Sequence, residues 1–257
     1  MMDKKNIRVE LDGMVALVTL DRPPVNALNR ATRYELIEVF DEISQRDDIR
    51  CAILTASGKT FCAGADLKDR PNPDDPGDFL AHNRAIRETG NAIRECDKPV
   101  IVAVNGAALG AGMGLIAASD IIYASEEARF GMPEINVGLA GGAAMLHAMF
   151  PRSTARRMFF TGVRLTAAEM KERGIIEEVT SAENLIPTAM AVAQEIASKA
   201  PLAIKYAKQT SNMIEEMPQR DAYRMEQNFT MALSKSEDAK EARMAFLEKR
   251  DPVFKGK

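Results

Sequence analysis

The stretch from Pro99 to Ser119 carries no charged side chain, and this limits what the chain can fold into more than any other feature. A run of this length could cross a bilayer as a helix. It is interrupted, however, by the turn dipeptide Asn105-Gly106 and by three further glycines, which disfavour one continuous lipid-facing helix. We therefore predict a strand over Val100–Val104, a tight turn and a helix over Ala111–Ala118, all buried in a globular domain.

The composition supports a folded protein with a large core. Hydrophobic residues make up 46% of the 257 residues and charged residues 28%, which is ordinary for a soluble enzyme. A chain of this length buries enough surface to fold without disulfides or a structural metal. The net charge of −3 argues against a nucleic-acid-binding surface, and His82 and His147 are too few for a multi-histidine metal site. We expect no nucleic-acid partner and no metal or redox cofactor.

The cysteines and the N-terminus bear on the compartment. Cys51, Cys62 and Cys96 are odd in number and form no CxxC pair, which indicates buried thiols in a reducing compartment. The first residues, MMDKKNIRVE, include acidic side chains and lack an apolar core, so we expect neither a secretory signal nor a transit peptide. We accordingly expect the protein in the cytoplasm.

Strands and helices alternate through the first half of the chain, an order typical of an α/β layer architecture. The predicted strands are Ile7–Leu11, Met14–Leu20, Cys51–Leu54, Val100–Val104 and Ile121–Ala124. The predicted helices are Arg30–Arg46, Phe79–Glu95, Ala111–Ala118, Leu185–Ser198, Leu202–Met213, Arg220–Leu233 and Glu237–Arg250. Asp12-Gly13 predicts a hairpin between the first two strands, and Thr166 to Glu169 forms a capping-box motif. The pattern predicts a core over residues 1–195 and a helical region over residues 196–257.

Common nucleotide and nucleophile motifs are absent from the sequence. It contains no GxxxxGK[ST] phosphate loop and no GxSxG nucleophile elbow. The run from Gly110 to Gly114 reads GxGxG, because Leu115 stands where a dinucleotide fingerprint needs its third glycine. Dinucleotide binding is therefore weakly supported.

Three other segments remain, namely Phe61–Lys68, Val104–Gly114 and Ala128–Glu134. Each one alone is consistent with an ordinary turn or a solvated acid. In this order and spacing they resemble the crotonase superfamily, also called the enoyl-CoA hydratase/isomerase family. The resemblance begins at Asp21–Leu28 and extends to the Glu-Lys-Arg of the last predicted helix.

The resemblance implies a fold in which repeated ββα units form a spiral core. The C-terminal helical region would support a homotrimer or a dimer of trimers and complete the coenzyme A site, where Phe246 and Lys249 match family positions that reach coenzyme A. Lys249 is equally consistent with a solvated lysine on a polar face. The implied substrate is an acyl-CoA thioester, as in fatty acid metabolism, with coenzyme A as part of the substrate and no membrane partner.

Enzymes that act next to a thioester carbonyl must stabilise an enolate-like oxyanion, and two backbone N–H groups can do this without a side chain. In the family, the donors are the residue after the glycine of the first motif and the middle residue of the second glycine turn. These positions match Ala65 and Ala111. Ala111 also begins a predicted helix, whose N-terminal end favours negative charge.

Well-studied hydratases of the family use two carboxylates, and this sequence keeps one of them. Glu134 matches the carboxylate that ends the third motif, and an apolar cleft would raise its pKa so that it could shuttle a proton at neutral pH. Gly114, three residues after Ala111, occupies the position of the missing second carboxylate. The acids that could replace it, none singled out by spacing, are Asp69, Asp74, Asp75, Asp78 and Glu88.

The resemblance also assigns the coenzyme A contacts of the first motif. Backbone groups of Ala63, Asp66 and Leu67 would line the adenine pocket, while Lys68 and Arg22 would lie near the phosphates. Lys68 is equally consistent with a solvated lysine, and Arg22 is the weaker assignment.

The reaction is left open between three activities. An enoyl-CoA hydratase is the first expectation, on family frequency alone. A Δ3,Δ2-enoyl-CoA isomerase is the alternative that Gly114 favours, because one base suffices for a 1,3-proton transfer. A non-catalytic acyl-CoA-binding homologue is the third, although the presence of Glu134 argues against it. Gly138 to Met145 lacks the proline and unbroken glycines frequent in the family, which leaves the acyl group undetermined.

Overall fold

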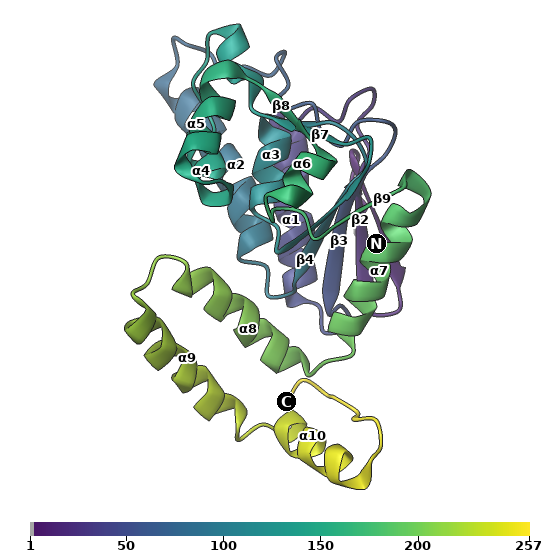
Figure 1. The fold of residues 1–257 in the computed structure, drawn as a ribbon. Helices are drawn as coiled ribbons and strands as arrows, with labels where there is room; N and C mark the ends of the chain where they lie inside the picture. The colour runs from purple at the N-terminus through teal and green to yellow at the C-terminus, as the bar shows by residue number, and fades with distance from the viewer. Residues whose placement is uncertain (1–2) are drawn as a thin grey trace.

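The structure is a computed structural model that describes residues 3–257 (Figure 1). Its strands are β1 (Ile7–Asp12), β2 (Val15–Leu20), β3 (Cys51–Ala56), β4 (Val100–Val104), β5 (Ala108–Leu109), β6 (Ile121–Ser125), β7 (Arg129–Gly131), β8 (Arg164–Thr166) and β9 (Glu178–Thr180). Its α-helices are α1 (Arg30–Gln45), α2 (Pro76–Arg94), α3 (Ala111–Ala117), α4 (Ala143–Met149), α5 (Arg152–Thr161), α6 (Ala167–Glu172), α7 (Ala182–Ala197), α8 (Pro201–Ile214), α9 (Gln219–Leu233) and α10 (Glu237–Glu248). One 3-10 helix, η1, spans Pro133–Val137. The predicted α/β fold class is confirmed.

The main sheet has the strand order β1-β2-β3-β4-β6-β9, and only the β1–β2 pair within it is antiparallel. The predicted hairpin is present. Asp12 still pairs with Val15, so the two-residue turn consists of Gly13 and Met14 rather than Asp12-Gly13. Gly13 adopts a φ of +57°, which a glycine accepts at no steric cost. The parallel arrangement places the carboxyl ends of β3 and β4 at the same edge of the sheet.

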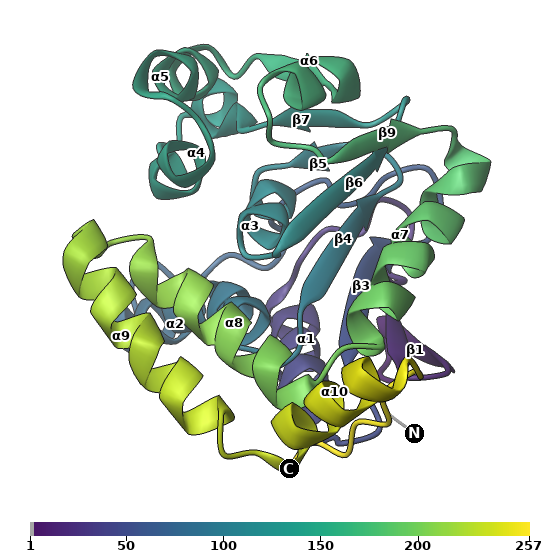
Figure 2. The ribbon, with the colours of Figure 1, turned by 60° about the horizontal axis from the view of Figure 1, so that its bottom comes forward.

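Helices cover both faces of this sheet, which explains why β3 and β4 are buried along their whole length. On one face, Leu54 and Val102 join the core that includes Phe40 of α1. On the other face, Ile53 and Ile101 pack with the buried side of α7 (Figure 2). The uncharged run that starts at Pro99 is therefore a central strand followed by a buried turn and helix, as predicted.

A second sheet, with the order β5-β7-β8, was not predicted from the sequence. Its strands have two or three residues each, too few to show an alternating pattern. It follows directly from the turn after β4 and carries the chain toward η1 and α4. The capping box predicted at Thr166 is confirmed, and its side chain accepts a hydrogen bond from the N–H of Glu169 at the start of α6.

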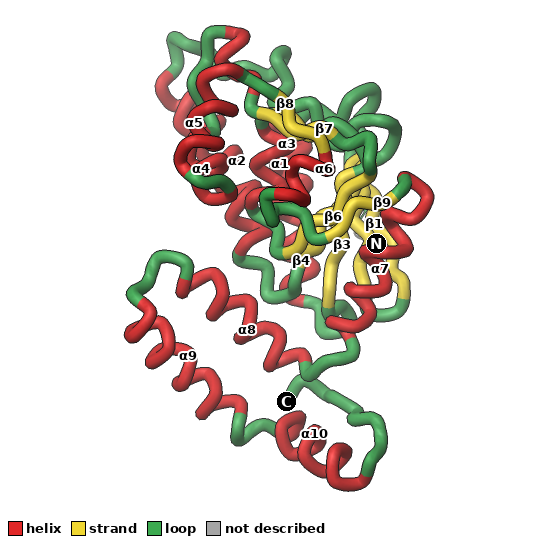
Figure 3. The backbone as a smooth tube through the Cα atoms, in the orientation of Figure 1, coloured by secondary structure: helices red, strands yellow, loops and turns green. Residues whose placement is uncertain are grey.

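Helices α8, α9 and α10 extend from the core as an arm below the sheet (Figures 1 and 3). The predicted boundary at residue 195 falls within the last turn of α7, and the two-unit division stays a prediction. Tyr206 and Phe229 stack with ring centroids 4.9 Å apart and join α8 to α9. No helix within residues 3–257 is long and apolar enough to span a membrane. The cytoplasmic location stays a prediction.

Candidate active site

Two glycine-rich turns follow the carboxyl ends of β3 and β4, and they are locked together by backbone contacts. The N–H of Cys62 donates to the carbonyl of Ala107 at 3.0 Å, and the N–H of Leu109 donates to the carbonyl of Cys62 at 2.8 Å. A Cβ on Gly112 would lie 2.7 Å from that same Cys62 carbonyl, so only glycine allows this approach. The two turns thus form one rigid unit.

Ala65 and Ala111 lie in these two turns, and their N–H groups are free. Among the residues described, neither N–H donates to a protein acceptor. The bonds from Leu28 N–H to the Gly64 carbonyl, at 2.8 Å, and from Asp66 N–H to the Leu28 carbonyl, at 3.0 Å, hold the backbone on either side of Ala65. A Cβ on Gly64 would lie 3.8 Å from the nitrogen of Ala111, so the turns meet at this point. The site therefore offers two fixed backbone donors.

Glu134, the second residue of η1, places its carboxylate against Gly110. A Cβ on Gly110 would collide with Oε1 of Glu134, and the φ of +53° also favours glycine at this position. Among the described residues, the buried Oε2 of Glu134 has no hydrogen-bond partner. Burial raises the pKa of Glu134 above its usual range. This carboxyl group lies against Gly110, the residue directly before Ala111, whose N–H is free.

Gly114 faces Met145 of α4. A Cβ on Gly114 would lie 3.1 Å from Sδ and 3.2 Å from Cε of Met145. The thioether thus occupies the space into which a side chain at position 114 would project. The sequence marked Gly114 as the position of a missing carboxylate, but it contained no signal that Met145 fills that space, because the two residues meet only through the packing of α3 against α4.

Known proteins resemble this chain over nearly its full length. The enoyl-CoA hydratase/isomerase family model matches residues 10–257. A 7a-methyl-1,5-dioxo-hexahydroindene-carboxyl-CoA hydrolase from Mycobacterium tuberculosis is 39% identical over 92% of this chain and 96% of its own length. A carnitinyl-CoA dehydratase from Escherichia coli is 37% identical over 98% of this chain and 99% of its own length. The crystal structure of an enoyl-CoA hydratase from Bacillus anthracis superposes with a TM-score of 0.92 at 33% identity, covering 98% of this chain and 100% of that one.

The chain belongs to the enoyl-CoA hydratase/isomerase family. The resemblance found in the sequence motifs is thereby confirmed, together with the crotonase fold. The roles of the individual site residues stay predictions, and the structure shows which groups surround each residue.

The residues predicted to hold coenzyme A in this family member are next to Ala65. Ala63, Leu67 and Lys68 are exposed on the loop that leaves the first glycine turn. The Asp66 carboxylate pairs with Arg22 at 2.6 Å and also accepts from the N–H of Lys68 at 3.0 Å. The Arg22 guanidinium further donates to the Ala27 carbonyl, so it holds this loop in place as well as bordering it.

The structure does not bring Phe246 and Lys249 to this loop. Both lie at the end of α10, which sits at the far end of the molecule from the glycine turns (Figures 1 and 2). The Phe246 side chain is 82% exposed. Within one chain, therefore, the C-terminal region does not complete the site as expected, and a role for these residues requires another copy of the chain.

Three of the acids considered as replacements for the missing carboxylate serve local structure. Asp69 accepts from the N–H of Arg30, Asp78 pairs with the Arg30 guanidinium at 2.5 Å, and Asp75 caps the start of α2. Within residues 3–257 no three His, Cys, Asp or Glu side chains gather to hold a metal ion.

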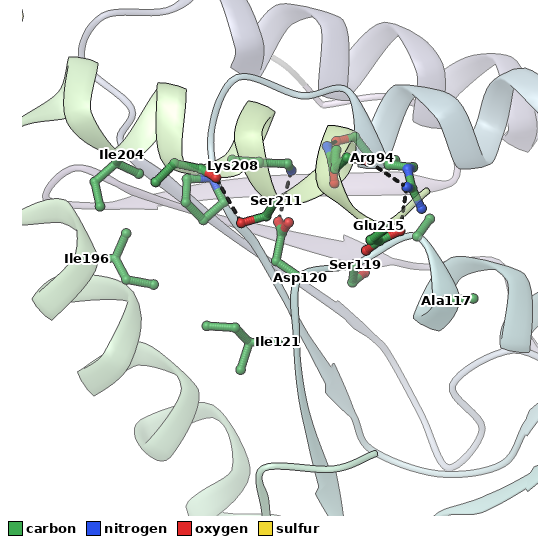
Figure 4. A pocket seen from close by; sticks show the side chains of 14 residues that line it. Arg94, Ala117, Ser119, Asp120, Ile121, Ile196, Ile204, Lys208, Ser211 and Glu215 are labelled. Atoms are coloured by element: carbon green, nitrogen blue, oxygen red, sulfur yellow. Dashed lines mark hydrogen bonds and ion pairs between the residues drawn. The ribbon is translucent and has the colours of Figure 1, made fainter. Parts of the chain in front are cut away.

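A cavity of about 320 Å³ lies at the other end of the parallel strands, before β4 and β6 begin (Figure 4). Its charged groups already pair with one another. Lys208 lies 2.9 Å from Asp120, and Arg94 lies 2.6 Å from Glu215. The Asp120 carboxylate also accepts from the N–H of Val100. This cavity lies where α8 packs against the core, at the end of the strands opposite the glycine turns.

The raised pKa of Glu134 predicts how stability changes with pH. A carboxyl whose pKa is raised by folding contributes stability that is fully present below its unfolded value of 4.5 and is lost as pH rises through the folded value. We expect Glu134→Gln, which stays neutral, to be more stable than the wild type at pH 8, by a margin that shrinks toward pH 4. Thermal melts from pH 4 to pH 8 measure this, with Glu127→Gln as the exposed control. A gain that does not grow with pH would contradict the assignment.

Proposed function

We propose that this protein is an enoyl-CoA hydratase that adds water to the double bond of a 2-enoyl-CoA thioester. The observation that carries the proposal is the half-buried carboxyl of Glu134, which lies against Gly110 with its buried Oε2 unpartnered among the described residues, beside the free N–H groups of Ala111 and Ala65. These three groups are what enolate chemistry at a thioester requires, namely two donors for the oxygen and one proton carrier.

The reaction follows from these roles. The N–H groups of Ala65 and Ala111 donate to the thioester oxygen as negative charge develops on it. Glu134 takes a proton from water while the water oxygen bonds to the β-carbon and the electrons of the double bond move into the enolate. Glu134 then returns that proton to the α-carbon, which regenerates the carbonyl. One carboxyl group thus serves as base and then as acid.

The relatives support a coenzyme A thioester as the substrate. Their names describe hydrolysis of a carboxyl-CoA, dehydration of carnitinyl-CoA and hydration of enoyl-CoA, and all three involve water and a CoA thioester. Dehydration is the reverse of the reaction proposed here. The acyl group differs among them, so family membership leaves it open.

A Δ3,Δ2-enoyl-CoA isomerase is the second candidate, favoured by the contact between Gly114 and Met145. This contact fills the space of a second carboxylate at position 114, and Glu134 lies against Gly110 beside the free N–H of Ala111. A single base can remove a proton from the α-carbon of a 3-enoyl-CoA and return it to the γ-carbon. No water has to be oriented for this reaction.

The two candidates differ in a simple absorbance assay. A hydratase removes the conjugated thioester absorbance of a 2-enoyl-CoA, whereas an isomerase creates that absorbance from a 3-enoyl-CoA. If neither signal changes, both assignments are wrong. Exchange of substrate α-protons in heavy water then tests for a non-catalytic acyl-CoA-binding protein, which would show binding without exchange and no effect of Glu134→Ala.

The contact between Gly114 and Met145 also gives a prediction. Gly114→Glu alone forces the new side chain against the thioether and is expected to lower hydration of a 2-enoyl-CoA. Adding Met145→Ala opens the space for the second carboxylate, so we expect the double variant to hydrate about tenfold faster than Gly114→Glu. Gly114→Glu with Met149→Ala, on the same helix, is the control. Equal rates for the two double variants would show that Met145 does not limit this position.

We also propose that the protein assembles as a homotrimer or a dimer of trimers. Large hydrophobic side chains are exposed along the C-terminal arm, including Tyr223 and Met231 on α9 and Phe246 and Leu247 on α10. A neighbouring copy would cover them and would allow Phe246 and Lys249 to reach its coenzyme A. Analytical ultracentrifugation tests the assembly, and a monomer at micromolar concentration would refute it.

A further inference from the structure

The first turn of α1 and the second turn of α2 bring together three basic side chains that have nitrogens without hydrogen-bond partners among the described residues. They are Arg30 and Arg33 on α1 and His82 on α2. No acidic residue occupies the first turn of α1, although negative charge is what a helix N-terminus favours. Arg30 pairs with Asp78, whereas Arg33 has no partner at this end of the helix, and its position needs another explanation.

Arg33 is the central member of this basic cluster. It is only 4% exposed, and among the described residues its guanidinium makes no hydrogen bond and no ion pair. Removing most of a guanidinium from water without a partner is costly, because its N–H donors lose hydrogen bonds to water. The Arg33 nitrogens are not fully buried, unlike Nε of Arg30, so they keep some contact with solvent. The charged or polarisable groups that face it are Cys62 and Asp69, neither of them within ion-pair or hydrogen-bond distance.

Arg30 and His82 also have side-chain nitrogens without partners among the described residues. Nε of Arg30 and Nδ1 of His82 are buried, and neither has a hydrogen-bond partner among residues 3–257. Burial, with the nearby charges of Arg33 and Arg30, lowers the pKa of His82. The lowered pKa favours the neutral ring, whose Nδ1 donates a hydrogen bond without adding a charge in the tautomer that carries the proton there.

The acids beside this cluster are already engaged. Asp78 accepts from Nη1 of Arg30 at 2.5 Å and from the N–H of Asn72 at 2.8 Å. Asp69 accepts from the N–H of Arg30 through Oδ2. Neither carboxylate pairs with Arg33, so the protein itself leaves the Arg33 charge uncompensated.

The basic cluster lies beside the turn that carries Ala65. Cys62, which Arg33 faces, precedes Ala65 by three positions, and Asp69 follows it by four. The backbone of Leu28, just before α1, bonds to the carbonyl of Gly64 and to the N–H of Asp66. The start of α1 is thereby attached to the backbone on both sides of Ala65, the proposed oxyanion donor.

We propose that Arg33, with Arg30 and His82, binds a carboxylate at the far end of the substrate's acyl group. This proposal rests on the acyl-CoA function proposed above and names its substrate class, a dicarboxylic acid joined to coenzyme A through one of its two carboxyl groups. A carboxylate accepts two parallel hydrogen bonds from a guanidinium and neutralises its charge. It would supply the partner that the buried Arg33 lacks.

Equilibrium binding of two unreactive ligands tests the proposal without turnover. Hexanoyl-CoA ends in a methyl group, and the mono-CoA thioester of hexanedioic acid has the same carbon number but ends in a carboxylate. We expect the wild type to bind the second ligand about 10- to 100-fold more tightly, as for a hydrogen-bonded charge pair. Arg33→Met should remove this preference, whereas Arg87→Met, at an exposed position on α2, should keep it.

Each outcome has a distinct meaning. Failure of the wild type to bind either ligand would refute the proposed acyl-CoA function. Binding of both with no preference for the carboxylate, repeated with the four- and eight-carbon pairs, would overturn the Arg33 proposal and leave that function intact. If Arg33→Met does not fold, the wild-type comparison over the three chain lengths still decides. A preference that Arg33→Met retains would assign the carboxylate to another part of the protein.

Discussion

Replacing Glu134 with Gln is expected to lower kcat/KM for the acyl-CoA substrate by about 10²–10⁴-fold, the range for removal of a general acid–base group. The carboxyl lies against Gly110, one residue from the free N–H of Ala111, and its Oε2 has no hydrogen-bond partner among the described residues. Gln has nearly the same shape but cannot carry the proton. The N–H groups of Ala65 and Ala111 are backbone atoms and are unchanged by the substitution, so part of the rate enhancement should remain.

Two measurements separate this loss from a general defect. The Kd of an unreactive acyl-CoA should change less than threefold in Glu134→Gln, because the carboxyl acts on the reacting carbons rather than on coenzyme A. Glu127→Gln changes an exposed glutamate on the connection between β6 and β7, seven residues before Glu134, and it should keep full activity. Retention of more than a tenth of the wild-type kcat/KM by Glu134→Gln would remove this residue from the mechanism.

Replacing Gly106 with Ala is expected to destabilise the protein by about 3 kcal/mol, because the added methyl group would collide with the backbone carbonyl of Lys59. Neither side can move away easily. The side-chain amide of Asn105 donates to the carbonyl of Gly58 at 2.8 Å, and the N–H of Cys62 donates to the carbonyl of Ala107 at 3.0 Å. These bonds hold the turns after β3 and β4 on both sides of the contact. The expected loss in Tm is ~6–12 °C for a chain of this size.

Gly90→Ala is the matched control for this substitution. Gly90 lies inside α2, and a Cβ there would meet no atom within 4 Å. An alanine in a helix interior is favoured over glycine by roughly 0.5–1 kcal/mol, so this variant should be slightly more stable than the wild type. Thermal and urea unfolding of both variants measure the contrast. Equal stability of Gly106→Ala and Gly90→Ala would show that the two turns are not rigidly joined.

Local patterns predicted most of the architecture. The apolar run of Val100–Val104 became a central strand because helices cover both faces of the sheet, and each of the seven predicted helices is present with ends shifted by a few residues. The shortest elements escaped prediction. Strands β5, β7 and β8 have two or three residues each. Their pairing depends on the path that the chain takes after β4, which the local sequence does not determine.

The candidate site divides in the same way. The resemblance to the family pointed to Ala65, Ala111 and Glu134, and the structure gives the first two free N–H groups and the third a carboxyl with a buried, unpartnered Oε2 among the described residues. The spacing carried no information about Met145, which occupies the space beside Gly114. The coenzyme A role of Phe246, implied by the resemblance, stays a prediction that requires a second copy of the chain, since α10 lies far from the glycine turns of its own chain.

The order of the motifs was enough to indicate the family, the fold and the one retained carboxylate, because these depend on residue types at short, regular intervals. Tertiary structure alone decided that the Glu134 carboxyl lies against Gly110 and that the Arg33 guanidinium is buried without a partner. Burial and hydrogen-bond partners depend on which elements pack together. The sequence does not show which residues far apart in the chain become neighbours in space. The physical reason is that the free energy of a buried charge depends on its surroundings rather than on its residue type.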